Sequence, residues 1–299
     1  MHSLKIGYTS VFVAILVLIL KYYAYYVTGS IALYSDALES VVNFLTGVTM
    51  LCSLYLSQQP PDKSHHFGHK KVEYFSALIE SFFLFIAAYY IVTESIEAFY
   101  HPRSFDEPII GMLLNMLATL LNGFWGFYLY HQGKKRKSLA LKADGVHLLV
   151  DVLTSCCVLA GLTVSLILKQ PLLDSIVAFV VGLYVVIVAI FVAKEAVDGL
   201  MDASPSLTIQ QDIYDRILHT DLRIKNVHEL RIRTSGSTLY VEFHLVVLPE
   251  MTVLEAHEIC NQIEDALHQK YKDIQTSIHV EPEGQLHENC LAHVYESIN

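Results

Sequence analysis

Two pairs of polar residues, each four positions apart, lie inside long apolar stretches of the sequence. Glu39 precedes Asn43 in one stretch, and His147 precedes Asp151 in another. A spacing of four places both members of a pair on one face of a helix. A charge inside a membrane costs at least about 2.5 kcal/mol on insertion scales, so a function is expected for it. Oxygen and nitrogen donors in two such pairs predict a four-ligand cage for a divalent cation, with helix packing and a proton relay as alternatives.

Further ligand-type side chains lie in polar parts of the chain. A loop between two apolar stretches holds Asp62, His65 and His69. The last third of the chain holds four histidines and a glutamate at positions where strands or a helix could bring them together: His228, His244, His257, His279 and Glu281. Any single one of these is more often a surface residue than a ligand. The 15 histidines in 299 residues still favour metal chemistry, because neutral imidazole is the commonest protein ligand for transition metals.

The composition predicts a membrane protein with a soluble domain. Hydrophobic residues make up 53% of the chain and charged residues only 17%, against roughly a quarter charged in ordinary soluble proteins. A helix needs about 20 apolar residues to cross the bilayer. Residues after about 205 have the composition of a soluble domain, so the predicted domains are 1–204 and 205–299. Six segments qualify as spans: 6–28, 32–56, 73–99, 107–130, 140–168 and 173–197.

The basic residues predict the orientation of these spans. Lys5, the loop lysines 63, 70 and 71, and the basic run 134–137 all lie in the N-terminal tail and the even-numbered loops, whereas the other loops carry only Arg103 and Lys169. The positive-inside rule therefore places both termini in the cytoplasm, and a multi-pass protein of the inner or plasma membrane is expected. The net charge of -10 excludes a nucleic-acid partner, and the five cysteines predict no disulfide framework.

The soluble part has the periodicity of an α+β domain. A polar helix is predicted at 207–219, followed by two alternating runs at 227–234 and 239–247 with Ser235-Gly236-Ser237 between them, which is typical of a hairpin. Apolar residues at helical spacing predict a helix at 252–270, and a short strand is expected at 274–280. The tail residues His287, Cys290 and His293 could bind metal, but a solvated tail is the favoured interpretation.

Three strings in the sequence resemble the cation diffusion facilitators. The resemblance covers nearly the whole chain and implies an all-α, six-helix transmembrane domain, followed by a ferredoxin-like, metallochaperone-like cytoplasmic domain. It also implies a homodimer in the lipid bilayer that exchanges divalent metal ions for protons. The strings are Gly29-Ser30-x-Ala32-Leu33-x-x-Asp36-Ala37-x-x-Ser40, His65-x-Phe67-Gly68-His69-x-Lys71-x-Glu73 and Ala143-Asp144-x-x-His147-x-x-x-Asp151.

The resemblance also implies roles for individual residues. A transport site falls on Glu39, Asn43, His147 and Asp151, a loop site on Asp62, His65 and His69 with His66 as a bystander, and a binuclear zinc site on His228, His244, His257, His279 and Glu281. Lys71 and Asp202 occupy the positions of the family's interlocking salt bridges, although generic surface charges explain them equally well. Asp36 and Asp144 are expected to support the transport site, and Asn43 is either a ligand or a residue that orients one.

The pair in the second span departs from the pattern of the family. Members dedicated to zinc usually carry Asp or His at the first position and Asp at the second, where this chain has Glu39 and Asn43. The loss of one carboxylate changes the charge of the site. Zinc is the first candidate substrate, and iron, cadmium, cobalt and manganese remain candidates too.

The expected function is export of a divalent cation from the cytoplasm in exchange for protons. Metal ligands shed protons when they bind, and histidine titrates near neutral pH, so His147 is the expected proton carrier and Asp151 the anchor of the metal charge. One rival is a membrane-anchored metal sensor or scaffold without transport. A metalloenzyme of the desaturase type would need several histidine boxes, and one histidine-rich loop is too few, so the chain is not expected to be an enzyme.

Overall fold

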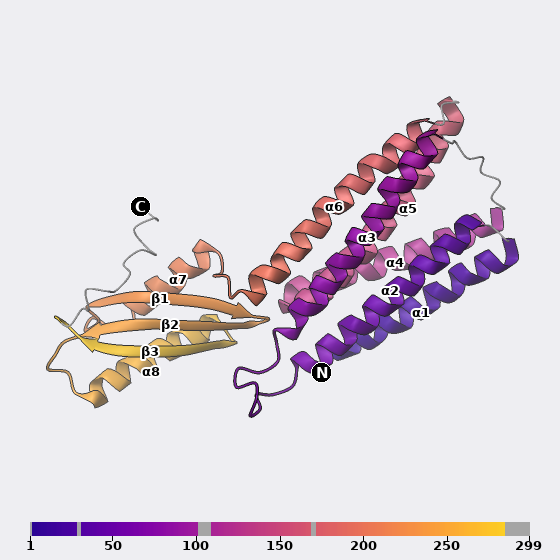
Figure 1. Ribbon diagram of the computed structural model, residues 1–299. Helices are drawn as coiled ribbons and strands as arrows, with labels where there is room; N and C mark the ends of the chain where they lie inside the picture. The colour runs from indigo at the N-terminus through magenta and orange to yellow at the C-terminus, as the bar shows by residue number, and fades with distance from the viewer. Residues whose placement is uncertain (1, 29–30, 101–108, 169–171, 285–299) are drawn as a thin grey trace. The chain divides into compact units, whose positions relative to one another are not determined.

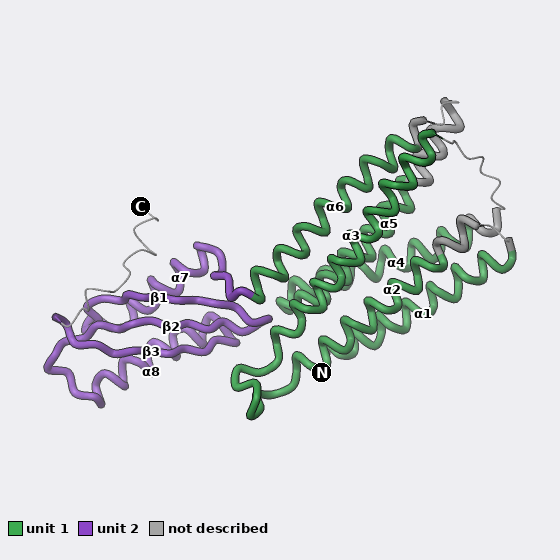
Figure 2. Tube along the Cα trace, in the orientation of Figure 1, with its two compact units in different colours: residues 1–200 green, residues 201–299 purple. Residues whose placement is uncertain are grey.

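The computed structural model describes residues 2–28, 31–100, 109–168 and 172–284. The chain divides into two compact units, Met1–Leu200 and Met201–Asn299, which Figure 2 shows in different colours. The first unit consists of long helices and the second contains a small sheet (Figure 1).

Within the described residues, the apolar stretches of the first unit form six long helices. Each has 27 to 30 residues, which is enough at about 1.5 Å per residue to reach across a bilayer. Their bounds agree with the predicted spans to within a few residues at most ends. The helices are α1 (His2–Thr28), α2 (Ile31–Ser57), α3 (Val72–Tyr100), α4 (Ile109–Arg136), α5 (Leu139–Leu168) and α6 (Leu172–Leu200).

Four helices in the described part of the chain are long and apolar enough to cross a membrane, by length and composition. These segments are Ser3–Val27, Ala37–Ser57, Val72–Tyr100 and Ser175–Leu200. Large apolar side chains on their outer surfaces are exposed, among them Phe12 at 65%, Phe82 at 61% and Phe191 at 68%. A surface with this much exposed aromatic area is suited to lipid rather than to water.

Helix α5 connects the two hydrophobic cores of the first unit. One core joins α3, α5 and α6 around Leu84 and Val185, and the other joins α1, α2, α4 and α5 around Met50 and Leu129. Side chains on α5 contribute to both cores. Polar residues on the same helix are therefore held between α2 on one side and α3 on the other.

Glycine allows α4 and α5 to approach each other at backbone contact distance. A Cβ added at Gly145 of α5 would lie 2.5 Å from the backbone nitrogen of Tyr130 and 2.9 Å from the carbonyl oxygen of Gly126, both on α4. Real Cβ atoms essentially never come so close to backbone, so no other residue fits at position 145 without separating the helices. This close crossing positions the segment of α5 that carries His147 and Asp151.

The second unit has the helices and strands in the predicted order. They are α7 (Leu207–Leu218), β1 (Asn226–Ser235), β2 (Thr238–Val247), α8 (Val253–Lys270) and β3 (Ile274–Pro282). The sheet order is β1-β2-β3, with β2 antiparallel to β1 and parallel to β3. A parallel neighbour requires a crossover connection, and α8 supplies it.

The core of the second unit lies on one face of the sheet. Alternate residues of β2, from Leu239 through Phe243 to Val247, pack with Ile217 of α7 and Ile263 of α8 in one apolar cluster. Helix α8 begins with a capping box, in which Thr252 and Glu255 satisfy each other's backbone N–H groups. Because successive strand residues point to opposite faces, the other set of β2 side chains, which includes His244, points away from the helices.

Candidate metal centre

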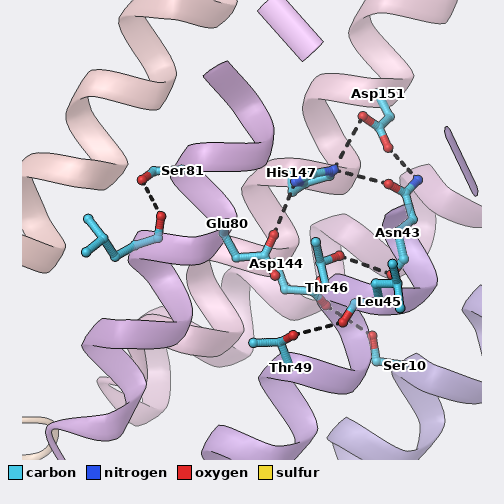
Figure 3. A network of polar contacts seen from close by, with 11 residues as sticks. Ser10, Asn43, Leu45, Thr46, Thr49, Glu80, Ser81, Asp144, His147 and Asp151 are labelled. Atoms are coloured by element: carbon cyan, nitrogen blue, oxygen red, sulfur yellow. Dashed lines mark hydrogen bonds and ion pairs between the residues drawn. The ribbon is translucent and has the colours of Figure 1, made fainter. Parts of the chain in front are cut away.

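A cluster of polar side chains from α2 and α5 lies buried in the first unit, as Figure 3 shows. Asn43 Nδ2 donates to Asp151 Oδ2 at 2.6 Å, and Asn43 Oδ1 lies 3.1 Å from His147 Nε2. His147 Nε2 is 4.0 Å from Asp151 Oδ1. All three residues are at most 5% exposed. The structure thus brings together three of the four residues predicted for the site.

These three residues offer chemically suitable ligand atoms. Protein ligands lie about 2.0–2.2 Å from a bound zinc ion, which puts the ligand atoms of a tetrahedral site roughly 3–3.5 Å from one another. Asn43 Oδ1 and His147 Nε2, at 3.1 Å, have that spacing, whereas His147 Nε2 and Asp151 Oδ1, at 4.0 Å, are slightly further apart. An amide oxygen, an imidazole nitrogen and a carboxylate can hold a divalent cation and still leave a coordination position open.

Glu80 of α3 is a further member of the cluster that the sequence analysis missed. Its side chain is fully buried, and its Oε2 lies 3.1 Å from His147 Nδ1. A signal was present in the sequence, since Glu80 is an acidic residue inside the third apolar segment. It has no ligand-type partner at four-residue spacing in its own helix, so its contact with α5 is visible only in three dimensions.

The remaining residues predicted near this site have different positions. Glu39 is half-buried one turn before Asn43, and the contacts that join Asn43, His147 and Asp151 do not involve it. Asp144 is buried and accepts a hydrogen bond of 3.1 Å from Ser10 Oγ. Asn43 and Asp144 are among the residues that line a small cavity. The side chain of Asp36 lies outside the described residues.

The loop between α2 and α3 brings Asp62, His65 and His69 together. Asp62 Oδ1 is 3.3 Å from His65 Nδ1, and Asp62 Oδ2 is 3.4 Å from His69 Nε2. One ligand atom from each residue falls within 4.8 Å of the others. The backbone N–H groups of His65 and Ser64 donate to Asp62 Oδ1 and lower the pKa of Asp62 to about 2. This carboxylate is therefore ionised wherever a neutral histidine is available to bind metal.

We predict that the loop binds zinc through Asp62, His65 and His69, and that Asp62→Asn weakens this binding about tenfold. The substitution removes the charge, while the amide oxygen still accepts the two backbone hydrogen bonds. The lowered pKa of Asp62 keeps its carboxylate charged above about pH 3, so the histidines alone should set the pH dependence of binding above that value. Titration of a full-length chain with zinc, in a background that lacks His244 and His279, measures this. His66→Ala is the matched control, and equal affinities for Asp62→Asn and the parent chain would contradict the prediction.

The sheet of the second unit carries a second histidine cluster. His228, His244 and His279 stand side by side in register on β1, β2 and β3, with ring centroids 5.1 and 4.7 Å apart for the two neighbouring pairs. The carboxylate of Glu281, on β3, contacts all three rings. Its Oε2 is 3.3 Å from His228 Nε2, and its Oε1 is 3.0 Å from His244 Nδ1 and 3.4 Å from His279 Nε2. A carboxylate that reaches three imidazoles fits a site for one or two metal ions.

The histidine cluster differs from the predicted one at two residues, Glu229 and His257. Glu229 was not predicted from the sequence. It lies in a β-bulge with φ +50°, a conformation that few residues other than glycine adopt. Its Oε2 lies 3.8 Å from His244 Nε2. His257 is exposed on α8 and lines a pocket with Ile278 and Val280, residues of the helix-covered side of β3. Within one chain, His257 is therefore on the opposite side of the sheet from the row of histidines.

Lys71 and Asp202, which were predicted to form salt bridges, each have a hydrogen-bond partner within their own unit. Lys71 Nζ donates to the carbonyl oxygen of Leu200 at 3.4 Å, and Asp202 Oδ1 accepts from Arg233 at 3.3 Å. Glu73, near Lys71, is buried and accepts hydrogen bonds from Ser57 of α2 and from Ser138, the residue before α5. The tail residues His287, Cys290 and His293 lie outside the described residues.

The long helices with exposed apolar surfaces indicate a multi-pass membrane protein. The polar residues buried among these helices are of types that can bind cations. The sequence matches the family described as cation efflux transmembrane domain over residues 8–201, and the family described as cation efflux protein, cytoplasmic domain, over residues 205–283. The chain belongs to the cation efflux family, and the resemblance to the cation diffusion facilitators is confirmed. It is thus a metal-transport protein with a transmembrane domain and a cytoplasmic domain.

The chain is similar to several individual proteins. The chain is 35% identical to the uncharacterized transporter sll1263 of Synechocystis sp. over 88% of its own length and 85% of that protein. It is 29% identical to the cation-efflux pump FieF of Serratia proteamaculans over 90% of its length and 89% of the pump. The metal-bound C-terminal domain of the CzcD transporter from Thermotoga maritima is 31% identical over 28% of this chain and all of that domain, with a TM-score of 0.25.

Proposed function

We propose that this protein exports divalent transition-metal cations from the cytoplasm in exchange for protons, and that Asn43, His147 and Asp151 form its transport site. The buried contact of these three side chains between α2 and α5 carries the proposal. A carboxylate and an imidazole are expensive to bury among apolar helices. A cation that passes between them offsets this cost, whereas a membrane anchor for a sensor has no need of either.

The proposed architecture extends what the family match shows. All six helices α1–α6 cross the membrane, both termini lie in the cytoplasm, and the domains comprise residues 1–204 and 205–299. Helices α4 and α5 support the count of six, because they pack against the four helices that are apolar enough to span. The second unit belongs to the ferredoxin-like class and pairs with its counterpart in a homodimer.

The proposed mechanism couples the cation to protons through ligand chemistry. In a state open to the cytoplasm, the cation binds Asp151, the neutral Nε2 of His147 and the amide oxygen of Asn43, while Glu39 stands one turn away on the same helix. Protons leave the ligands as the cation binds, because metal and proton compete for the same lone pairs. After the protein opens outward, protons from that side return to the ligands and release the cation. Asp144 supports α5 through its hydrogen bond with Ser10.

Zinc is the first candidate substrate, because a mixed set of nitrogen and oxygen ligands with an open position suits this ion. Iron, cadmium, cobalt and manganese remain candidates. The described cluster holds one carboxylate, Asp151, in contact with the Nε2 side of His147. An amide at position 43 lowers the negative charge that the cation meets and is expected to weaken selection for one metal over another.

Flux in proteoliposomes tests the proposal. The purified dimer is reconstituted, and entry of zinc, iron(II), manganese and cadmium is followed with and without an imposed pH gradient. Gradient-dependent flux of at least one metal is expected. No flux of any metal, with metal still bound by the second unit, would favour the rival function of a membrane-anchored sensor or scaffold.

We further propose that the row of histidines in the second unit holds a regulatory metal. His228, His244, His279 and Glu281 would bind it, and His257 can join them only from the second chain of a dimer, because it lies on the helix-covered side of its own sheet. Metal shared between two chains would tighten their association and favour the transport-competent dimer.

The double variant His244→Ala/His279→Ala tests this regulatory role. It removes two of the three imidazoles in the row, so we expect about 100-fold weaker zinc binding by the second unit and several-fold slower transport at low zinc concentration. His268→Ala, an exposed histidine on α8, is the matched control. Transport by the double variant at the parental rate across the whole zinc range would contradict the role.

A further inference from the structure

We propose that Glu80 is a positioning residue of the transport site, which holds the imidazole of His147 by Nδ1 so that Nε2 faces Asn43 and Asp151. The inference rests on the proposed function of that site. It assigns to α3 a part in metal binding that the i, i+4 pairs on α2 and α5 do not reveal. Glu80 would not touch the cation itself.

The two nitrogens of His147 meet different partners. Nε2 is 3.1 Å from Asn43 Oδ1 and 4.0 Å from Asp151 Oδ1, whereas Nδ1 is 3.1 Å from Glu80 Oε2. Figure 3 shows the ring with Glu80 on one side and with Asn43 and Asp151 on the other. An imidazole points its two nitrogens in divergent directions, so a cation held at Nε2 by Asn43 and Asp151 has the ring between itself and Glu80.

The surroundings of Glu80 indicate that its carboxylate interacts mainly with His147. The side chain is 0% exposed, and within the described part of the chain neither of its carboxylate oxygens accepts a hydrogen bond with good geometry. His147 Nδ1 is its ion-pair partner. A buried carboxylate with so few donors is unfavourable for folding alone. Catalytic and binding contacts of this kind tighten when the substrate arrives, which would align the Nδ1–H donor with Glu80.

A carboxylate behind a ligand histidine has a defined effect on metal binding. It fixes which nitrogen carries the proton, holds the plane of the ring and makes the other nitrogen a stronger donor. In this chain a strongly donating His147 is especially important for metal binding, because position 43 supplies a neutral amide instead of a second carboxylate. Loss of such a partner typically lowers metal affinity about 10- to 100-fold.

The test compares Glu80→Leu, which fills the space without an acceptor, with Glu80→Gln, whose amide oxygen still accepts from Nδ1. Zinc transport by the full-length dimer in proteoliposomes is measured over a range of zinc concentrations. We expect Glu80→Leu to raise KM about 10- to 100-fold with kcat changed much less, and Glu80→Gln to recover most of the loss. Ser81→Ala is the matched control, because Ser81 is buried next to Glu80 and donates a hydrogen bond to the carbonyl oxygen of Leu78 in its own helix.

Two results would overturn the positioning role. A KM for Glu80→Leu within twofold of the parent would show that His147 needs no partner at Nδ1. Equal impairment of Glu80→Gln and Glu80→Leu would show that the negative charge acts directly on the cation. If Glu80→Leu is not recovered as a folded dimer, Glu80→Ala, which leaves space instead of filling it, replaces it with the same two criteria.

A second comparison separates this inference from the proposed function. If Glu80 acts only through His147, the effect of Glu80→Leu on zinc affinity should disappear in a His147→Ala background, whereas an independent effect would add to that of His147→Ala. Parental flux that Asp151→Ala abolishes but Glu80→Leu leaves intact would refute the role of Glu80 alone. Absence of flux in the parent, or its survival in Asp151→Ala, would refute the proposed transport site itself.

Discussion

Asp151→Ala is expected to lower metal flux at least 100-fold while the dimer remains folded. The substitution leaves an imidazole and an amide on the Nε2 side of the site, so no negative charge there offsets the charge of the cation. Truncation of one partner of a buried charged contact typically costs several kcal/mol, and roughly 2.7 kcal/mol already corresponds to 100-fold. Asp151 also accepts a 2.6 Å hydrogen bond from Asn43 Nδ2, so the substitution also removes a contact that orients the amide of Asn43.

The measurement is zinc uptake into proteoliposomes under an imposed pH gradient. Asp198→Ala is a matched control, because Asp198 is an exposed carboxylate on α6. Asp151→Asn separates charge from shape, since the amide keeps the size of the side chain, and it should be nearly as inactive as the alanine variant. Parental flux through Asp151→Ala would refute the assignment of the site to α2 and α5.

Gly145→Val is expected to prevent the first unit from folding into its native packing. The new Cβ would lie 2.5 Å from the nitrogen of Tyr130, and backbone atoms cannot change rotamer to avoid it. Overpacking against side chains typically costs about 1–3 kcal/mol, and a clash with backbone should exceed that range. The helices α4 and α5 would have to separate, and His147, two residues further along α5, would move with them.

The readout is the yield and thermal stability of monodisperse protein in detergent. Gly47→Ala on α2 provides a matched control, because a Cβ at that position would meet nothing within 4 Å. It should be neutral or stabilise the helix by up to about 1 kcal/mol, since alanine is the better helix former. A Gly145→Val protein with the melting temperature of the parent would show that the α4–α5 crossing is more tolerant than the contact distances require.

Most of the architecture could be predicted because it depends on local patterns. Long apolar stretches gave the six helices, and alternation around Gly236 predicted the hairpin of β1 and β2, since both signals repeat within one segment. The bulge at Glu229 could not be predicted in this way. It depends on how β1 aligns with β2, and the alternating pattern alone does not contain that information.

The site was predictable only where its residues share an element or a loop. The spacing of His147 and Asp151, and of Asp62, His65 and His69, is visible in the sequence, and the structure places each set together. Glu80 was missed because nothing in α3 indicates which of its faces meets α5. The side of the sheet on which His257 lies was also not predictable, because helical spacing does not tell which side α8 will cover.

The alignment of the histidines across the sheet has a consequence for folding. His228, His244 and His279 are neighbours only in the native pairing of the strands, and Glu281 joins them because it lies two residues after His279. A slip of β3 by one residue would turn His279 and Glu281 toward the helices. Metal bound across all three strands would therefore stabilise the native pairing of the strands and no shifted pairing. Only domains whose strands are correctly aligned would bind the metal.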